Sequence, residues 1–436
     1  MMKKNRTIYF LLALVCLGLQ SCLFQEEDYF DDSSANRATA DVKRCSELLE
    51  AAPNGWVMEY YVGKDYSLGG ITLLCKFDGQ RVTMASQIAG ADETVSSLYS
   101  VKSEQATMLS FDTYNYLVHY FGQPQGSMAD DPNGTLGGDY EFVISDATAD
   151  RIELKGKKYG NRIVMKAFSA DQTWKQYLTR IKKVEDDAFF YEYDLRMDGL
   201  YTGQMLRSNY TFIVTYYDEV GKVYQKTVPF MFTTDGMRFH EPVTIDGQTM
   251  QNFVWKNEEI SFVCTDEGAT GVKMKGIYID GYQSYDYYPG TYLMDFYRLN
   301  GATNQLEVAS QEIQLVKNED GKSYWLKGLE YDILVTYDKP RGGLSILPQF
   351  LKKVQGGYVY LAMWDLMNDY VLRSSAIGLI SYPTTDGIYL VDNGVWMGEI
   401  SGFIFGVYDS QDEEASFMGY TDAVAAIRLV KKTIEE

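Results

Sequence analysis

The sequence has few of the residues on which enzymes most often depend. It contains only two histidines, His119 and His240, and neither belongs to an HExxH motif or to another metal-ligand spacing. It also lacks a GxSxG nucleophile elbow, a Walker A loop and a GxGxxG motif. Both histidines stand among aromatic residues, and we expect them to be structural. The motif search therefore identifies no catalytic residue and no cofactor, and favours a non-enzymatic protein.

Cysteine is scarce as well. The chain has five cysteines and no CxxC pair, so neither a zinc ribbon nor a thioredoxin-like site is supported. Three of them, Cys45, Cys75 and Cys264, follow the N-terminal segment. Free cysteine is among the most buried residue types, so we interpret these three as small core residues. A Cys45–Cys75 disulfide is the alternative in an oxidising compartment.

Positive charge is in deficit, because 40 Lys and Arg face 60 Asp and Glu, which gives a net charge of −20. Proteins that bind nucleic acid rely on clustered Lys and Arg to contact the phosphate backbone. Direct binding to an anionic lipid surface also depends on basic residues. The composition therefore excludes nucleic acid as a partner and argues against surface binding to anionic lipid.

A long hydrophobic run is also absent. The longest apolar stretch, residues 8–19, has 12 residues, whereas a membrane-spanning helix needs about 20. The stretch follows Lys3, Lys4 and Arg6, a pattern typical of a secretory signal. It ends in LQSC, which resembles the lipobox of bacterial lipoproteins. The resemblance implies that residues 1–21 are removed and that Cys22 is acylated, which would anchor the chain in the outer membrane. A plain signal peptide cut elsewhere is the alternative.

An acidic cluster follows the cysteine at once. It resembles the export signal of Bacteroidetes-type lipoproteins, which would place the chain on the outer face of the outer membrane. The other interpretation is a solvated, self-repelling tether over residues 22–40. The residues of the cluster are Gln25, Glu26, Glu27 and Asp28.

The remainder of the chain has the composition of a β protein. Short alternating runs of Tyr, Phe, Val and Ile are separated by Gly-containing turn signals, and Pro is rare, with nine residues. We expect a mainly β fold with a few helices, in which two or three antiparallel β-meander modules are barrel- or sandwich-like. The predicted modules are residues 41–168 with a leading helix capped by Asp41, 169–285 and 286–436. An amphipathic helix opens the second, with Trp174 on its apolar face.

Two segments merit a binding hypothesis. The first is a glycine-flexible loop with hard oxygen donors, which suits calcium, although ordinary turn chemistry explains it equally well. Its candidate ligands are Asp131, Asn133, Asp139 and Glu141. The second is a Tyr-rich loop that could stack on sugar rings, unless its rings fill strand edges and a module interface. Its candidate residues are Tyr282, Tyr285, Tyr287 and Tyr288.

Several segments follow one another in a recognisable order: NGWVMEYY, GGITLLCKFDG, SFDTYNYLVHYFGQP, GGDYEFVI, LKGKKYGNRIVM and VPFMFTTDGMRF. This succession resembles Bacteroidetes lipoproteins of the domain-of-unknown-function family 4302, from about Asp41 to the C-terminus. The resemblance implies an accessory lipoprotein of a nutrient-uptake locus, near outer-membrane transporter pairs and sometimes a zinc-binding peptidase lipoprotein. It supplies no catalytic or binding residue.

These observations lead to one functional expectation and two alternatives. We expect a non-enzymatic surface lipoprotein that binds a glycan or peptide, or assembles with an outer-membrane transporter complex. A carboxylate-based glycoside hydrolase is the first alternative, because 60 acids always permit pairs at the required separation. A structural partner of a neighbouring secreted peptidase is the second.

Overall fold

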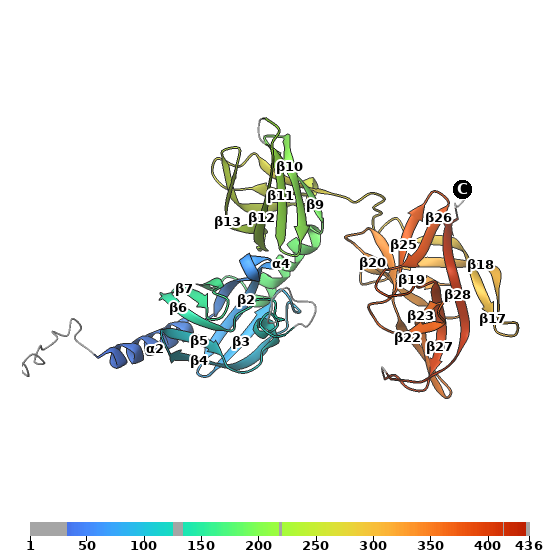
Figure 1. Cartoon of the computed structure of the whole chain (residues 1–436), viewed down its shortest axis with the longest axis horizontal. Coiled ribbons are helices and arrows are strands. Elements are labelled where there is room, and N and C mark those ends of the chain that lie inside the picture. Colours follow the sequence, from blue (N-terminus) through green and yellow to red (C-terminus); the bar gives the residue numbers. More distant parts are fainter. Residues whose placement is uncertain (1–32, 125–133, 218–219, 413, 433–436) are drawn as a thin grey trace, which may run out of the picture. The chain divides into compact units, whose positions relative to one another are not determined.

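The structure, a computed structural model, describes residues 33–124, 134–217, 220–412 and 414–432. It is mainly β, as the sequence predicts, and its strands form three antiparallel sheets (Figure 1). The chain divides into two compact units. One holds residues 1–182, 209–211 and 229–241, and the other holds residues 183–208, 212–228 and 242–436.

The first sheet is a closed eight-stranded barrel in which each strand pairs with the next and β8 pairs back with β1. Alternate side chains enter its interior, which large residues such as Trp56, Tyr60 and Phe142 fill. The interior is therefore a packed core. The strands are β1 Trp56–Val62, β2 Gly69–Asp78, β3 Arg81–Ser86, β4 Val95–Ser103, β5 Thr107–Phe111, β6 Glu141–Ala147, β7 Arg151–Gly156 and β8 Arg162–Ala167.

Three helical segments accompany this barrel: the 18-residue α2 Ser34–Ala51 and the short η2 Lys64–Tyr66 and α3 Tyr116–His119. The predicted leading helix is present, but its predicted cap is wrong. The side chain of Ser33 caps α2 by accepting from the Asn36 amide. Asp41 lies inside the helix and accepts hydrogen bonds from Thr107 and Arg44. The helix therefore includes residues 34–40 of the predicted tether.

Helix α4, Trp174–Asp187, confirms the predicted amphipathic helix. A capping box starts it, because the Thr173 hydroxyl accepts from the Gln176 amide while the Gln176 side chain accepts from the Thr173 amide. Leu178 and Ile181 are fully buried, whereas Trp174 is half-buried.

The second sheet closes another eight-stranded barrel, in which β16 pairs with β9. Phe212, Phe230 and Phe239 are among its buried residues. Its elements are β9 Glu192–Met197, β10 Leu200–Ser208, β11 Thr211–Tyr217, β12 Val223–Phe232, β13 Gly236–Ile245, β14 Gln248–Lys256, η4 Asn257–Glu259, β15 Ser261–Cys264 and β16 Val272–Ile277.

The third sheet has twelve strands. Eight of them pair in a ring, in the order β17-β18-β19-β20-β21-β25-β26-β28, and β28 pairs back with β17. Because β28 is 15 residues long, it also pairs with β27, and a strip β28-β27-β23-β22 continues from the ring. The strands are β17 Gly290–Asn300, β18 Gln305–Lys317, β19 Ser323–Lys327, β20 Ile333–Asp338, β21 Gly343–Ile346, β22 Gln349–Val354, β23 Gly357–Asp365, β24 Tyr370–Leu372, β25 Leu379–Thr384, β26 Gly387–Asp392, β27 Gly402–Tyr408 and β28 Phe417–Lys431.

The three described cysteines, Cys45, Cys75 and Cys264, are buried free thiols, which agrees with their interpretation as core residues. Burial raises the pKa of the Cys264 thiol to about 11.

In the part of the chain that the structure describes, no helix combines the length and apolar character needed to cross a membrane.

Candidate functional site

Several predicted site residues lie outside the described part of the chain. They are Cys22, Gln25, Glu26, Glu27, Asp28, Asp131 and Asn133.

The other two calcium candidates, Asp139 and Glu141, lie in the described part of the chain, and both carboxylates already bind other groups of the protein. The Asp139 carboxylate accepts from the backbone amides of Lys158, at 2.7 Å, and Tyr159, at 3.1 Å. Glu141 forms ion pairs with Lys102, at 2.9 Å, and Lys157, at 3.1 Å. Among the described residues, no group of three or more His, Cys, Asp or Glu side chains could hold a metal ion.

The predicted tyrosine platform is not a single exposed surface. Tyr288 is fully buried, and its hydroxyl donates to the carbonyl of Gly342 at 2.8 Å. Tyr285 is half-buried, donates to the carbonyl of Ser323 and stacks on Tyr324, with 4.7 Å between ring centroids. The prediction is therefore wrong at Tyr288, which cannot stack on a ligand.

The two remaining tyrosines of that segment are more accessible. Tyr282 is half-buried and accepts a hydrogen bond from the Tyr337 hydroxyl at 3.1 Å. Tyr287 is exposed, with the Lys431 ammonium group 5.1 Å from its ring centroid. The segment thus mainly packs against the core of the third sheet, where its tyrosine hydroxyls donate hydrogen bonds to backbone carbonyls.

The two histidines also have structural surroundings. His119 in α3 stacks on Tyr140, with centroids 4.7 Å apart, and burial lowers its pKa. His240 on β13 lies 4.3 Å from both the Tyr61 and the Tyr66 ring, and burial likewise lowers its pKa.

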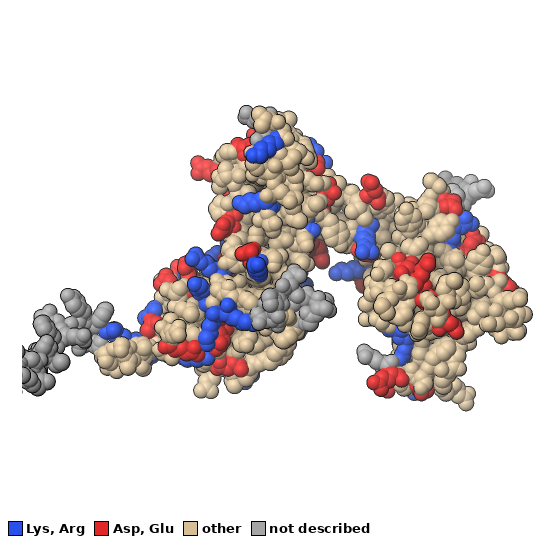
Figure 2. Space-filling model, viewed as in Figure 1, with Lys and Arg blue, Asp and Glu red and all other residues tan. Residues whose placement is uncertain are grey.

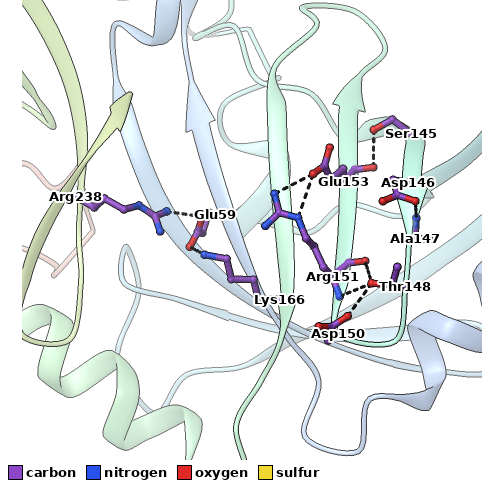
Figure 3. A network of polar contacts seen from close by, with 10 residues as sticks. All are labelled: Glu59, Ser145, Asp146, Ala147, Thr148, Asp150, Arg151, Glu153, Lys166 and Arg238. Carbon is purple, nitrogen blue, oxygen red and sulfur yellow. Dashed lines mark hydrogen bonds and ion pairs between the residues drawn. The ribbon is translucent and has the colours of Figure 1, made fainter. Parts of the chain in front are cut away.

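Glu59 on β1 is the centre of a shielded charge network (Figure 3). Its carboxylate contacts Arg238 at 2.5 Å and Lys166 at 2.8 Å, and only 14% of its side chain is exposed. Burial alone would raise the pKa of Glu59, but the two cations together lower it. A general acid for glycoside hydrolysis instead needs a raised pKa. The network therefore suits a structural link between β1 and residues 229–241 of the same unit.

Figure 3 shows a second network at the β6–β7 hairpin, which is much more exposed. Arg151 pairs with Glu153 at 2.9 Å, and both side chains are nearly half exposed. The Thr148 hydroxyl bonds to Asp150 and to the carbonyl of Arg151, which fixes the turn. Charges elsewhere are also mixed in sign, since Figure 2 shows Lys and Arg interspersed with Asp and Glu on the first barrel.

An open groove lies beside the start of α4. Its volume is about 570 Å³, which falls within the range of small-molecule sites. All its lining residues belong to the first unit. They are Pro53, Asn54, Lys76, Thr83, Thr94, Phe168, Ala170, Asp171, Gln172, Thr173, Trp174 and Gln176, and we call this set the α4 groove.

The position of Trp174 in this groove follows from local geometry. Its indole N–H donates to the carbonyl of Asn54 at 3.0 Å. Gly55 adopts a φ of +83°, and a Cβ there would lie 3.0 Å from the indole ring. Glycine at this position thus permits both the turn before β1 and the close approach of Trp174. The half-buried indole packs against a small cluster that includes Phe168 and Leu178.

The lining of the α4 groove is partly polar and partly apolar. Apart from the two aromatic rings, most of its lining consists of hydroxyl and amide side chains, with one cation, Lys76, and one carboxylate, Asp171. Phe168 is buried beneath the groove. Hydroxyls and amides both donate and accept hydrogen bonds, while the half-buried Trp174 ring offers apolar contact. This combination matches a ligand with many hydroxyl groups and an apolar face.

Two smaller hollows lie elsewhere. One, of about 380 Å³, is lined by residues of α2, β4 and nearby turns and contains Glu50 and Asp112. Glu50 accepts from the Tyr99 hydroxyl at 3.1 Å. The other, of about 410 Å³, contains Asp280 and Asp338, and Asp338 pairs with Arg341 at 3.6 Å.

Comparison with known families matches nearly all of the described chain to domains without an assigned role. The family model described as domain of unknown function (DUF4302) matches residues 26–257. A second model, DUF4987, likewise described as a domain of unknown function, matches residues 265–404. No curated protein matches the chain.

Proposed function

The chain belongs to the DUF4302 family, and from this premise we propose that it is a non-enzymatic binding component of an outer-membrane nutrient-uptake system. In this proposal the α4 groove holds a saccharide. The observation that carries it is the composition of the groove, in which the half-buried ring of Trp174 lies beside a lining rich in hydroxyl and amide groups. Because side chains fill the interior of the first barrel, a ligand of this barrel would bind on its outer surface.

Binding is favoured over hydrolysis by the acid count of the groove. Glycoside hydrolysis generally uses two carboxyl groups on opposite sides of the scissile bond, about 5 Å apart or somewhat more. Asp171 is the one carboxylate in the groove lining. Glu59, the most shielded acid in Figure 3, is held ionised by two cations. The groove thus has groups to recognise a sugar but lacks the acid pair that would cleave one.

The proposed location depends on the N-terminal residues. Acyl chains on Cys22 would hold the protein at the membrane, since several chains together give stable anchoring. The acidic cluster at residues 25–28 would direct it to the outer face, where a saccharide from the medium is first met.

The saccharide proposal is tested with the full chain, purified in mild detergent, on an array of neutral mono- and disaccharides. We expect retention of at least one sugar, and a loss of at least tenfold in affinity in a Thr94→Ala/Gln172→Ala double variant. That loss corresponds to about 1.4 kcal/mol, a reasonable sum for two hydrogen-bonding side chains. The matched control is Gln225→Ala/Thr227→Ala on β12, because both residues are exposed and line none of the hollows described. Retention that is equal in the two double variants would overturn the assignment of the groove.

The anchor is tested by a Cys22→Ser variant. We expect this variant to leave the membrane fraction, because the thiol that carries the acyl chains is absent, whereas a Cys45→Ser variant should remain membrane-bound. The measurement is fractionation of cells, followed by protease treatment of intact cells that express the unaltered chain. Cleavage in intact cells is expected for an outward-facing protein. Protection until lysis would contradict the proposed location.

A further inference from the structure

Part of one strand in the third sheet has a neighbouring strand on one side only. β17 and β18 form a long hairpin (Figure 1), in which every residue from 305 to 315 of β18 pairs with β17 without a bulge. On its other side, β18 pairs with β19 only over residues 314–317. Within the described part of the chain, no strand pairs with that side of residues 305–310. We call these six residues the open edge.

The backbone of the open edge is oriented for pairing with a further strand. The Asn318 amide donates to the Ser323 carbonyl at 2.9 Å, at the turn between β18 and β19. Backbone groups alternate along an antiparallel strand, so the even-numbered residues of β18 direct their N–H and C=O groups towards the β19 side. In the open edge these residues are Leu306, Val308 and Ser310. Their backbone groups face the side that has no strand.

Apolar side chains cover the sheet face beside this edge. Val308 pairs with Tyr297 of β17, and Leu306 pairs with Leu299, and directly paired residues of antiparallel strands point to the same side. Val308 is 79% exposed, Tyr297 44% and Leu306 40%. Ala309, on the opposite face, packs against the core of the third sheet. The outer face of the hairpin is therefore an apolar surface that reaches the open edge.

The strand at the end of this sheet is protected against pairing, whereas the open edge is not. Natural proteins protect exposed edge strands with lysine, proline or β-bulges. β22, the last strand in the sheet order, carries Lys352 and Lys353 and has a bulge between Phe350 and Lys352. The open edge, QLEVAS, has no lysine, arginine, proline or bulge, and Glu307 is its one charged residue. This contrast favours a strand that pairs with another chain.

A second copy of the same strand fits the open edge. Antiparallel pairing about a two-fold axis at Val308 places the two Val308 residues opposite each other and Leu306 opposite Ser310. Glu307 then lies opposite Ala309 of the second copy, so no two like charges are paired. An axis at Glu307 would instead place two carboxylates opposite each other, which is destabilising. The sequence of the edge is thus complementary to itself in the register centred on Val308.

From these observations we propose that the chain dimerises through the open edge, so that two β17–β18 hairpins join in one four-stranded antiparallel sheet. The ladder satisfies the outward backbone groups of residues 306–310. Tyr297 and Val308 of each copy then form a continuous apolar row across the interface, which removes apolar surface from water. The inference does not depend on the saccharide proposal, because none of these residues lines the α4 groove.

The association is tested by sedimentation equilibrium of the full chain in density-matched mild detergent. A salt concentration of about 0.15 M screens the repulsion between two acidic chains beyond about 8 Å. We expect the mass of a dimer. Val308→Lys should raise the dissociation constant of this dimer at least tenfold, because it places two lysines opposite each other at the axis. Val316→Lys is the matched control, since Val316 lies on the same strand, is 41% exposed and already pairs with Trp325 of β19. It should dimerise as the unaltered chain does.

The register is tested by a cysteine at the axis. The Cα atoms of a hydrogen-bonded antiparallel pair lie about 5.5 Å apart, a separation that a disulfide spans. Val308→Cys should therefore give a covalent dimer on mild oxidation, detected on a non-reducing denaturing gel. Val316→Cys carries the same native cysteines and should run as a single chain. Both positions are exposed, so both variants should keep the thermal unfolding profile of the unaltered chain.

Three outcomes would overturn the inference. The first is a monomeric mass for the unaltered chain. The second is a Val308→Lys variant that dimerises as tightly as Val316→Lys, which would place the interface on another surface. The third is equal cross-linking of the two cysteine variants, which would show that position 308 has no special proximity to its counterpart.

Discussion

Replacing Glu59 with alanine is expected to lower the free energy of unfolding by about 3 kcal/mol, because removal of one partner from a buried ion pair leaves the other charge uncompensated. The variant would leave Arg238 without its carboxylate in a site where its side chain is only 24% exposed. Lys166, 43% exposed, would be affected less, because solvent reaches it. The measurement is chemical denaturation of the full chain, followed by circular dichroism.

Glu153→Ala is the matched control, because Glu153 also pairs with an arginine of the first unit (Figure 3). Its side chain is 46% exposed and that of Arg151 is 45% exposed, and exposed pairs contribute only about 0.5 kcal/mol. Equal losses in the two variants would contradict the structural role assigned to Glu59.

The Glu59 network also has a defined dependence on pH. The pKa of Glu59 is lowered in the folded chain, so its stabilising contribution is present above the usual glutamate pKa of about 4.3. The contribution disappears as the pH falls through the lower, folded pKa. The stability difference between the unaltered chain and Glu59→Gln should therefore be constant near neutral pH and shrink below about pH 4.

A Trp174→Leu variant is expected to lose at least tenfold in saccharide affinity, as measured by isothermal titration calorimetry with a disaccharide retained on the array. Leucine preserves a good helix former at the start of α4 but removes the flat ring that the groove presents. It also removes the indole N–H that donates to Asn54, a loss of about 1 kcal/mol in stability.

Trp325→Leu on β19 provides the control for this second prediction. Trp325 is half-buried, like Trp174, but lines none of the hollows described. Its replacement should leave saccharide affinity within about twofold. If both leucine variants bind as tightly as the unaltered chain, the α4 groove is not the saccharide site.

The fold was largely predictable because strand alternation and turn signals are local. The helical spacing of the apolar residues in α4 is likewise visible in its own sequence, and Leu178 and Ile181 are buried as that spacing indicates. The start of α2 was missed because its first residues, SANRATA, are almost all exposed and carry no apolar stripe to mark a helix. The cap at Ser33 becomes recognisable only from its hydrogen bond to Asn36.

The sites were less predictable because their parts come together only through tertiary structure. Tyr288 lies in a segment with the composition of a loop, yet its hydroxyl is satisfied by Gly342, which is distant in the sequence. The α4 groove combines the turn before β1, residues of β2 and β3, and the start of α4. The only local signal of a groove was the segment SADQTW, in which the aromatic Trp174 follows mostly polar residues.

The contacts of Tyr408 with Tyr360 and Phe417 in the third sheet illustrate the same limit. Tyr358 and Tyr360 alternate in a single strand, so their common face follows from the sequence. The order β28-β27-β23-β22 is not sequential, and no local pattern brings Tyr408 and Phe417 beside them. Such a surface depends on strand pairing across long stretches of chain.

Hydrogen–deuterium exchange with and without a retained disaccharide tests the central claim most directly, because it locates the ligand on the full chain. Bound sugar is expected to slow exchange in peptides that cover residues 76–94 and 168–176, and to leave the peptides of β22 and β23 unchanged. Protection confined to another part of the chain, or no protection at a saturating sugar concentration, would contradict the assignment of the α4 groove as the saccharide site.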